Sequence, residues 1–129
     1  MRVVKGLVKG PFKNEAAFKA AVLKVWEKTL ARFTHFQIEN EEKEPGMPDI
    51  LSISSVSPAY FTEFKVSNKD GVIRFESTQP AFYKRNEHLD ISILAWDVPR
   101  QRVVEITPEE VIAQKSLSLK IPEETNEVD

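Results

Sequence analysis

Two short segments in the middle of the chain bring acidic and basic side chains to the end of two expected strands. Residues 46–53 read Gly-Met-Pro-Asp-Ile-Leu-Ser-Ile, and residues 60–66 read Tyr-Phe-Thr-Glu-Phe-Lys-Val. Their β-branched and aromatic residues favour strands. Because side chains alternate along a strand, Glu63 and Lys65 point to the same face. If the two strands are neighbours, Asp49 comes beside Glu63, and two carboxylates and an ammonium group converge.

This arrangement has a metal-binding interpretation and an ordinary structural one. Two carboxylates held close together repel each other and retain protons unless a cation lies between them. Hard divalent cations such as Mg²⁺ prefer oxygen ligands of this kind. Asp49 and Glu63 are therefore candidate ligands for Mg²⁺ or Mn²⁺. The ordinary interpretation is that Pro48-Asp49 is a turn and that Glu63 and Lys65 form a salt bridge on an exposed strand.

The rest of the chain alternates between helical and strand patterns. Asn14 is a good N-cap, and apolar residues recur at helical spacing as far as Phe33, which predicts a helix over 15–33. Residues 1–13 contain a short apolar alternation that predicts an arm or an edge strand. The later predicted elements are strands 34–40, 49–55 and 60–66, an extended piece 72–75, a helix 78–88 with Ser77 or Thr78 as its cap, strands 90–96 and 101–106, and a short helix from Thr107-Pro108 to about Lys115.

This order of elements predicts an α/β fold with a mixed central sheet and helices on both faces. Short connections imply antiparallel pairing of the first strands, whereas the connection through helix 78–88 allows a parallel neighbour. A length of 129 residues predicts one domain. We expect its core over about 14–106. The polar, Glu-rich residues 116–129 predict a flexible acidic tail.

Composition excludes several classes of site. The chain has no cysteine, which excludes disulfides, cysteine-based zinc sites and cysteine-ligated iron–sulfur clusters. It has no apolar run long enough to span a membrane, and its N-terminus lacks the pattern of a signal peptide. We therefore expect a cytoplasmic protein with no membrane partner.

Charge is distributed unevenly although the formal net charge is only −2. Residues 5–32 carry seven basic and two acidic side chains, whereas residues 39–49 carry five acidic side chains and one basic one. A metal-dependent nuclease shows this polarity, and a solvated helix of mixed charge shows it too. The candidate contacts to a nucleic-acid backbone are Lys24, Lys28, Arg32, Lys69, Lys84 and Arg85.

Taken in order, the motifs resemble the signature of the PD-(D/E)XK nuclease superfamily, and in particular the small phage-type VRR-NUC and Holliday-junction-resolvase-like nucleases. The resemblance covers about residues 14–97 and implies a restriction-endonuclease-like core. The matching elements are a helix led by Glu15, the segment Ile38-Glu39-Asn40, the motif Gly46-x-Pro48-Asp49, the motif Glu63-x-Lys65 and a helix led by Gln79.

The resemblance implies metal-dependent hydrolysis of phosphodiester bonds in DNA. Asp49 and Glu63 would hold one or two Mg²⁺ or Mn²⁺ ions together with the backbone carbonyl of Phe64. Lys65 would orient or deprotonate the attacking water, or stabilise the transition state. Gln79 would position the water, the lysine or a phosphate oxygen.

Four questions stay open from the sequence alone. The third acidic ligand is expected to be Glu15, with Glu27 and Glu39 as alternatives. The substrate could be a DNA junction, a flap, a duplex end or a specific site, and a homodimer is a further expectation because small enzymes of this kind often resemble two-fold dimers. The alternative function is a non-catalytic nucleic-acid-binding or interaction module on the same fold.

Overall fold

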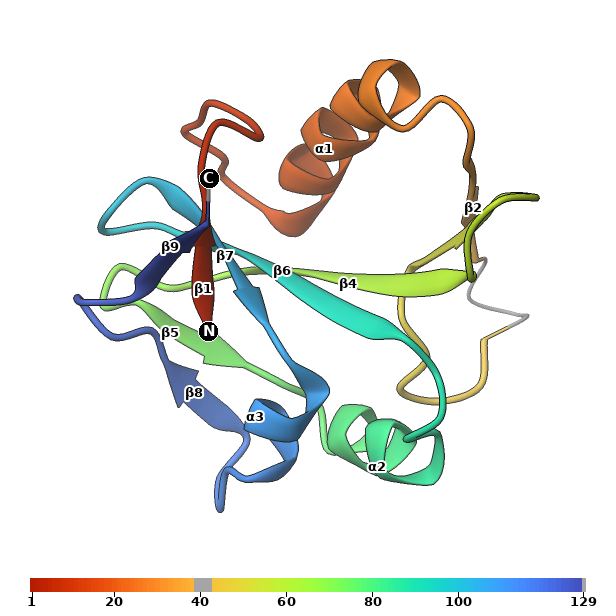
Figure 1. The fold of residues 1–129 in the computed structure, drawn as a ribbon. Helices are drawn as coiled ribbons and strands as arrows, with labels where there is room; N and C mark the ends of the chain where they lie inside the picture. Colours follow the sequence, from red (N-terminus) through yellow and green to blue (C-terminus); the bar gives the residue numbers. More distant parts are fainter. Residues whose placement is uncertain (39–42, 129) are drawn as a thin grey trace.

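The computed structural model describes residues 1–38 and 43–128, and these residues form an α/β fold (Figure 1). The predicted positions Glu39 and Asn40 lie outside the described residues. Within the described part of the chain the helices are α1 (Glu15–Thr29), α2 (Thr78–Arg85) and α3 (Pro108–Ile112). The strands are β1 (Arg2–Val4), β2 (Thr34–Gln37), β3 (Ile50–Ile53), β4 (Tyr60–Val66), β5 (Val72–Arg74), β6 (Ile91–Asp97), β7 (Arg102–Ile106), β8 (Ser118–Lys120) and β9 (Asn126–Val128).

The central sheet is mixed, as the sequence predicts. Its strand order is β2-β3-β4-β6-β7-β1-β9, and β5 and β8 form a separate two-stranded sheet. Strands β2, β3 and β4 pair antiparallel, β2 with β3 and β3 with β4. Strand β6 lies parallel to β4, and the crossover between them contains α2. The pairing directions inferred from connection lengths are therefore confirmed.

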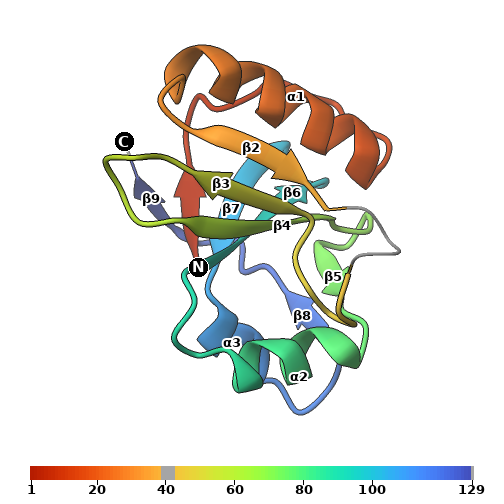
Figure 2. The same cartoon turned by 90° about the vertical axis from the view of Figure 1, so that its right-hand side faces the viewer.

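Helices lie on both sides of the central sheet, with α1 on one side and α2 and α3 on the other (Figures 1 and 2). Each side has its own apolar core. On the α1 side the buried residues include Phe18, Val22, Trp26, Phe64, Leu94 and Trp96. On the α2 side they include Phe82, Tyr83, Ile91, Ile93, Val104 and Ile106. None of the helices in the described ranges is long and apolar enough to cross a membrane.

Helix α1 begins where the sequence predicts and ends earlier. The side chain of Asn14 caps its first turn, as expected. The predicted range 15–33 overran the helix because Phe33 continues the apolar spacing. In the structure Phe33 lies beyond the helix end, and its ring stacks on His35 with 6.2 Å between the ring centroids. Phe33 is therefore apolar because its ring packs from the turn that follows α1.

The two ends of the chain are more ordered than the sequence predicts. Strand β1 lies inside the sheet, between β7 and β9, so the core extends beyond the predicted range 14–106. Strand β8 pairs with β5, and the side chains of Leu119 and Ile121 are 4% and 0% exposed. Within the predicted tail 116–129, residues 118–121 are therefore packed, because these two apolar side chains fill the α2-side core despite their polar neighbours.

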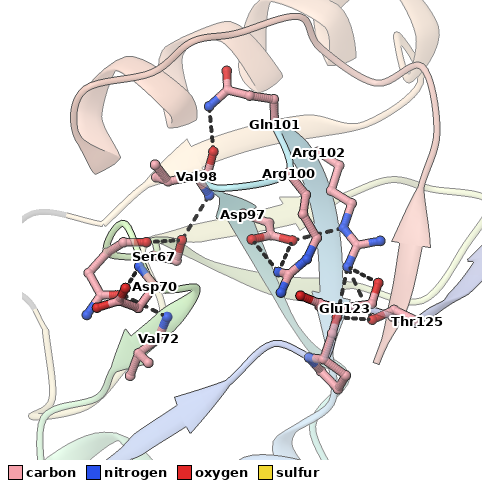
Figure 3. Close-up of polar contacts among 12 residues, drawn as sticks. Ser67, Asp70, Val72, Asp97, Val98, Arg100, Gln101, Arg102, Glu123 and Thr125 are labelled. Atoms are coloured by element: carbon pink, nitrogen blue, oxygen red, sulfur yellow. Dashed lines mark hydrogen bonds and ion pairs between the residues drawn. The ribbon is translucent and has the colours of Figure 1, made fainter.

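A buried carboxylate ties the last segment to the β6–β7 turn (Figure 3). Asp97 is fully buried and accepts hydrogen bonds from Arg100 and from Arg102 Nε, the latter at 2.9 Å. Arg102 also donates to the backbone carbonyl oxygens of Pro122 and Glu123. The segment after β8 is thus held by a paired buried charge, an arrangement that leaves no signal in local composition.

Candidate functional site

A polar pocket of about 340 Å³ contains every side chain that the sequence predicts to be catalytic. Its walls come from the start of α1, the loop before β3, strand β4 and the start of α2. The lining residues are Glu15, Lys43, Glu44, Pro45, Gly46, Met47, Asp49, Glu63, Lys65, Glu76 and Gln79. We call this the polar pocket below.

The register of β3 and β4 brings the two predicted ligands together. Ile50 lies opposite Thr62, and the same register extended by one residue sets Asp49 opposite Glu63. Glu63 is only 4% exposed. Burial and then the negative charge of Asp49 raise the pKa of Glu63 to about 8. At neutral pH Glu63 therefore keeps its proton and donates a hydrogen bond to Asp49.

Asp49 stays ionised because a lysine neutralises it. Burial alone would raise the pKa of Asp49, but hydrogen bonds from Lys43 and Glu63 hold it below its ordinary value. The Nζ atom of Lys43 lies 2.7 Å from Asp49 Oδ1. Sequence reasoning missed this residue. The signal that could have found it is that Lys43 is the single basic residue in the acidic run 39–49.

Lys65 is a buried ammonium group beside the carboxylate pair. Its side chain is on the same face of β4 as Glu63, and the residue is 8% exposed. Its Nζ atom lies 5.1 Å from the centroid of the Phe75 ring, which is a cation–π distance. Both ionisable side chains of the Glu-x-Lys motif thus lie inside the fold, in contrast to an exposed strand face.

The structure separates the candidates for the third acidic residue. Glu15 lines the polar pocket, whereas Glu27 lines a different pocket beside Phe33 and His35. Desolvation raises the pKa of Glu15, Lys65 opposes that rise, and the charge of Asp49 adds to it. Glu15 is therefore within electrostatic reach of the pair. The third candidate, Glu39, lies outside the described residues.

Gln79 lies at the start of α2, and the oxygen of its side-chain amide already accepts a hydrogen bond. Its Oε1 atom accepts a hydrogen bond of 2.9 Å from the backbone N–H of Glu76, and the residue is 7% exposed. Ser77 occupies the N-cap position, which is one of the two positions that the sequence predicts, but its side chain makes no capping hydrogen bond. Because Oε1 is occupied, the Nε2 amino group is the end that Gln79 offers to the pocket.

Gly46 brings the loop before β3 against the start of α2. It has a positive φ of 85°, and a Cβ atom at this position would overlap the backbone carbonyl of Thr78. This close approach of Gly46 to the backbone of Thr78 fixes the wall of the pocket.

Two further residues lie next to the carboxylate pair. The Phe64 ring points to the opposite face and packs on Phe18, with 5.6 Å between the ring centroids, so only its backbone can face the pocket. The Tyr83 hydroxyl is buried and has no hydrogen-bond partner among the described residues. Burial and the charges of Glu63 and Asp49 raise the pKa of Tyr83.

The predicted basic contacts are dispersed. Lys24 and Lys28 line a separate pocket with the segment 6–9. Arg32, Lys69 and Lys84 are exposed and do not line the polar pocket. Arg85 lies 3.7 Å from Glu44, which is on the pocket rim.

The donor set of the pocket suits a small hard cation. Within residues 1–38 and 43–128 no group of three or more His, Cys, Asp or Glu side chains has the placement of a metal site. The pair formed by Asp49 and Glu63 nevertheless fits a divalent ion, since a cation can replace the proton that the pair retains. Comparisons with protein-family models, curated proteins and solved structures find no match for this chain.

Proposed function

We propose that the chain is a metal-dependent endonuclease that hydrolyses phosphodiester bonds in DNA, with the polar pocket as its active site. One observation carries the proposal. All five predicted catalytic side chains line a single pocket, although they come from α1, the loop before β3, β4 and α2. Residues chosen only for a surface salt bridge or a turn would not be expected to converge in this way.

Burial of the charged groups supports the same proposal. Glu63 and Lys65 are 4% and 8% exposed. Burying a carboxyl group and an ammonium group costs free energy, and the carboxyl group keeps its proton as a result. Groups kept in such an environment with a strongly raised pKa are typical of functional sites. A solvated salt bridge would carry neither the burial nor the pKa shift of Glu63.

Asp49 and Glu63 are the residues that would hold one or two Mg²⁺ or Mn²⁺ ions, with the backbone carbonyl of Phe64 as a further oxygen donor. Glu15 would contribute directly or through a water molecule. When bound, the ion supplies charge neutralisation at the phosphate and lowers the pKa of a water molecule. Glu63 would give up its proton on loading, because both carboxylates must be ionised to act as ligands.

The remaining side chains act on the phosphate and the water. The ammonium group of Lys65 would stabilise negative charge that develops on the phosphoryl oxygens, or would orient the attacking water. The Nε2 group of Gln79 would donate a hydrogen bond to that water or to a phosphate oxygen. The contact between Gly46 and Thr78 holds the loop and α2 together, so these groups are positioned before substrate arrives.

The test is cleavage of supercoiled plasmid, single-stranded DNA and branched DNA in Mg²⁺ and in Mn²⁺. Wild-type protein should cleave in either metal and not in EDTA, and Asp49→Asn should abolish cleavage. Glu27→Gln is the matched control, since Glu27 is a carboxylate of the same helix as Glu15 that lines another pocket. Loss of activity in the control equal to that in Asp49→Asn, or no cleavage by wild type, would refute the proposal.

A second candidate function is a non-catalytic nucleic-acid-binding module. The ion pair between Lys43 and Asp49 favours it, because the ammonium group occupies a carboxylate that a cation would need. This module would bind DNA without cleaving it, and Mg²⁺ or Mn²⁺ would leave its melting temperature unchanged. Under the nuclease proposal both ions raise the melting temperature by mass action, and Asp49→Asn removes the rise.

A further inference from the structure

The face of the sheet that carries the carboxylate pair continues into a row of apolar side chains. Phe36 lies opposite Leu51 across β2 and β3, and Leu51 lies opposite Phe61 across β3 and β4. Asp49 and Glu63 are two residues further along the same strands. Because side chains repeat on one face every two residues, this apolar row lies about 7 Å from the pair on the same face.

The apolar row is only partly covered. The Phe36 side chain is on the edge strand β2 and is 50% exposed, and Ile53, one step further along β3, is 42% exposed. Leu51 and Phe61 are half-buried. Figure 2 shows β2 and β3 at the front of the molecule, with α1 above them and α2 below. The row is therefore accessible from the same side as the candidate ligands.

Helix α1 accounts for the opposite face of these strands. Trp26 stacks on His35, with 5.2 Å between the ring centroids, and its ring meets the edge of Tyr60 at 6.3 Å. Residues that alternate with Phe36 and Phe61 are thus the ones packed under α1. The packing under α1 therefore does not require the half-exposed Phe36 ring on the opposite face of the sheet.

We propose that the apolar row stacks unpaired nucleobases of the strand whose phosphate enters the polar pocket. This inference rests on the proposed nuclease function and adds the substrate class: single-stranded DNA, or the single-stranded part of branched DNA. Aromatic side chains stack any base whose face is free, whereas the bases of a duplex are already stacked on one another.

The polar pocket and the apolar row beside it match the two chemical parts of a nucleotide. A nucleotide joins an anionic phosphate to a flat aromatic base, and a single extended nucleotide can reach from the polar pocket to the row beside it. Lys65 in the pocket suits the phosphate, while Phe36 suits the base.

The experiment measures stacking directly. Single-stranded oligonucleotides containing 2-aminopurine lose fluorescence when the base stacks, and binding is followed by anisotropy in Ca²⁺, with a blunt duplex of the same sequence for comparison. Wild type should bind the single strand more tightly than the duplex and quench 2-aminopurine. Phe36→Leu should weaken single-strand binding about 5-fold or more and remove the quenching, while Phe36→Tyr retains both.

Leu117→Ala is the matched control, because Leu117 is 44% exposed and lies outside this face. It should bind and quench like wild type, and a thermal melt of each variant checks the fold. Equal affinity for single strand and duplex, or quenching that survives Phe36→Leu, would overturn the stacking inference while leaving the nuclease proposal intact if plasmid is still cleaved. Protein that neither binds nor cleaves DNA would overturn both.

Sedimentation velocity tests the other possible occupant of the apolar row, which is a second copy of the chain. If Phe36→Leu converts a dimer to a monomer and leaves the quenching unchanged, the row is an interface between copies of the chain and the stacking inference is wrong. An unchanged sedimentation coefficient, together with lost quenching, is the result that we expect.

Discussion

Asp49 and Glu63 face each other across the β3–β4 pair and hold one proton between them at neutral pH. The proton is retained because Glu63 is buried and Asp49 remains ionised. This arrangement couples the stability of the metal-free protein to pH. It also means that a proton, a lysine and a cation compete for the same pair of carboxylates.

The first prediction concerns stability against pH in EDTA. The pKa of Glu63 rises from its ordinary value of 4.5 to about 8 in the folded protein. The folded state therefore binds the proton more tightly, and the stabilisation is complete below pH 4.5 and is lost as the pH rises through 8. The free energy of unfolding should fall by up to roughly 5 kcal/mol between pH 5 and 9.

Urea denaturation at several pH values measures this decline. Glu63→Gln should remove it, so that the variant becomes more stable than wild type at pH 9. Asp49→Asn should make the decline smaller and move it to lower pH, because the variant lacks the neighbouring negative charge. A wild-type stability that rises from pH 5 to 9 in EDTA would contradict the assignment of the shared proton.

The second prediction concerns Lys43 as a competitor of the metal. Lys43→Met keeps the length of the side chain and removes the ammonium group that lies 2.7 Å from Asp49. Mn²⁺ should then bind about 3- to 10-fold more tightly, because one positive charge no longer opposes it. Titration of Mn²⁺ followed by electron paramagnetic resonance measures the change. Weaker Mn²⁺ binding in the variant would show that Lys43 supports the site.

The third prediction separates catalysis from metal binding at Lys65. Lys65→Met should leave Mn²⁺ affinity unchanged or increased, since it removes a positive charge near the carboxylates. Turnover should fall about 10²-fold or more, as expected for loss of a positioned catalytic group. Lys115→Met is the control and should cleave like wild type, because Lys115 is exposed, lies outside the polar pocket and is not among the candidate DNA contacts. Wild-type turnover by Lys65→Met at saturating metal would assign the residue a structural role only.

The fourth prediction concerns the wall of the pocket. Gly46→Ala would set a Cβ atom against the carbonyl of Thr78 and force a positive φ on alanine. Gly6 also has a positive φ, of 71°, but open space surrounds it. Gly6→Ala should therefore cost about 1 kcal/mol and Gly46→Ala about 3 kcal/mol or more in urea denaturation. Equal costs would mean that the loop before β3 moves away from α2 without penalty.

The fifth prediction ranks the basic residues. Arg85 lies near the pocket rim through Glu44, whereas Lys24 and Lys28 line another pocket. Reversing Lys84 and Arg85 to Glu should weaken DNA binding for all sequences and reduce the dependence of log Kd on log salt by about 1 to 2 units. Reversing Lys24 and Lys28 should change the slope less. The opposite ranking in anisotropy titrations would relocate the phosphate contacts to α1.

Local chemistry in the sequence determined the elements and the choice of site residues. Asn14 and Thr107 cap the helices for which the sequence predicts them, and Thr107 forms a capping box with Glu110. Strand β4 has the predicted bounds. Because a strand alternates its side chains, the sequence predicts that Glu63 and Lys65 share one face of β4.

Only the tertiary structure decided the environment of those residues. The pairing of Lys43 with Asp49, the contact of Gly46 with Thr78 and the row that runs from Phe36 to Phe61 depend on register and on loop paths.

The ends of the chain also show the difference between what the sequence predicts and what the tertiary structure decides. Strand β1 pairs with β7 and with β9, which lie about 100 and about 124 residues away in sequence, and local composition carries no record of such partners. Secondary-structure patterns reflect interactions between neighbours in sequence. Burial, and with it the raised pKa of Glu63, arises when distant segments exclude water together, and this is decided only by the complete fold.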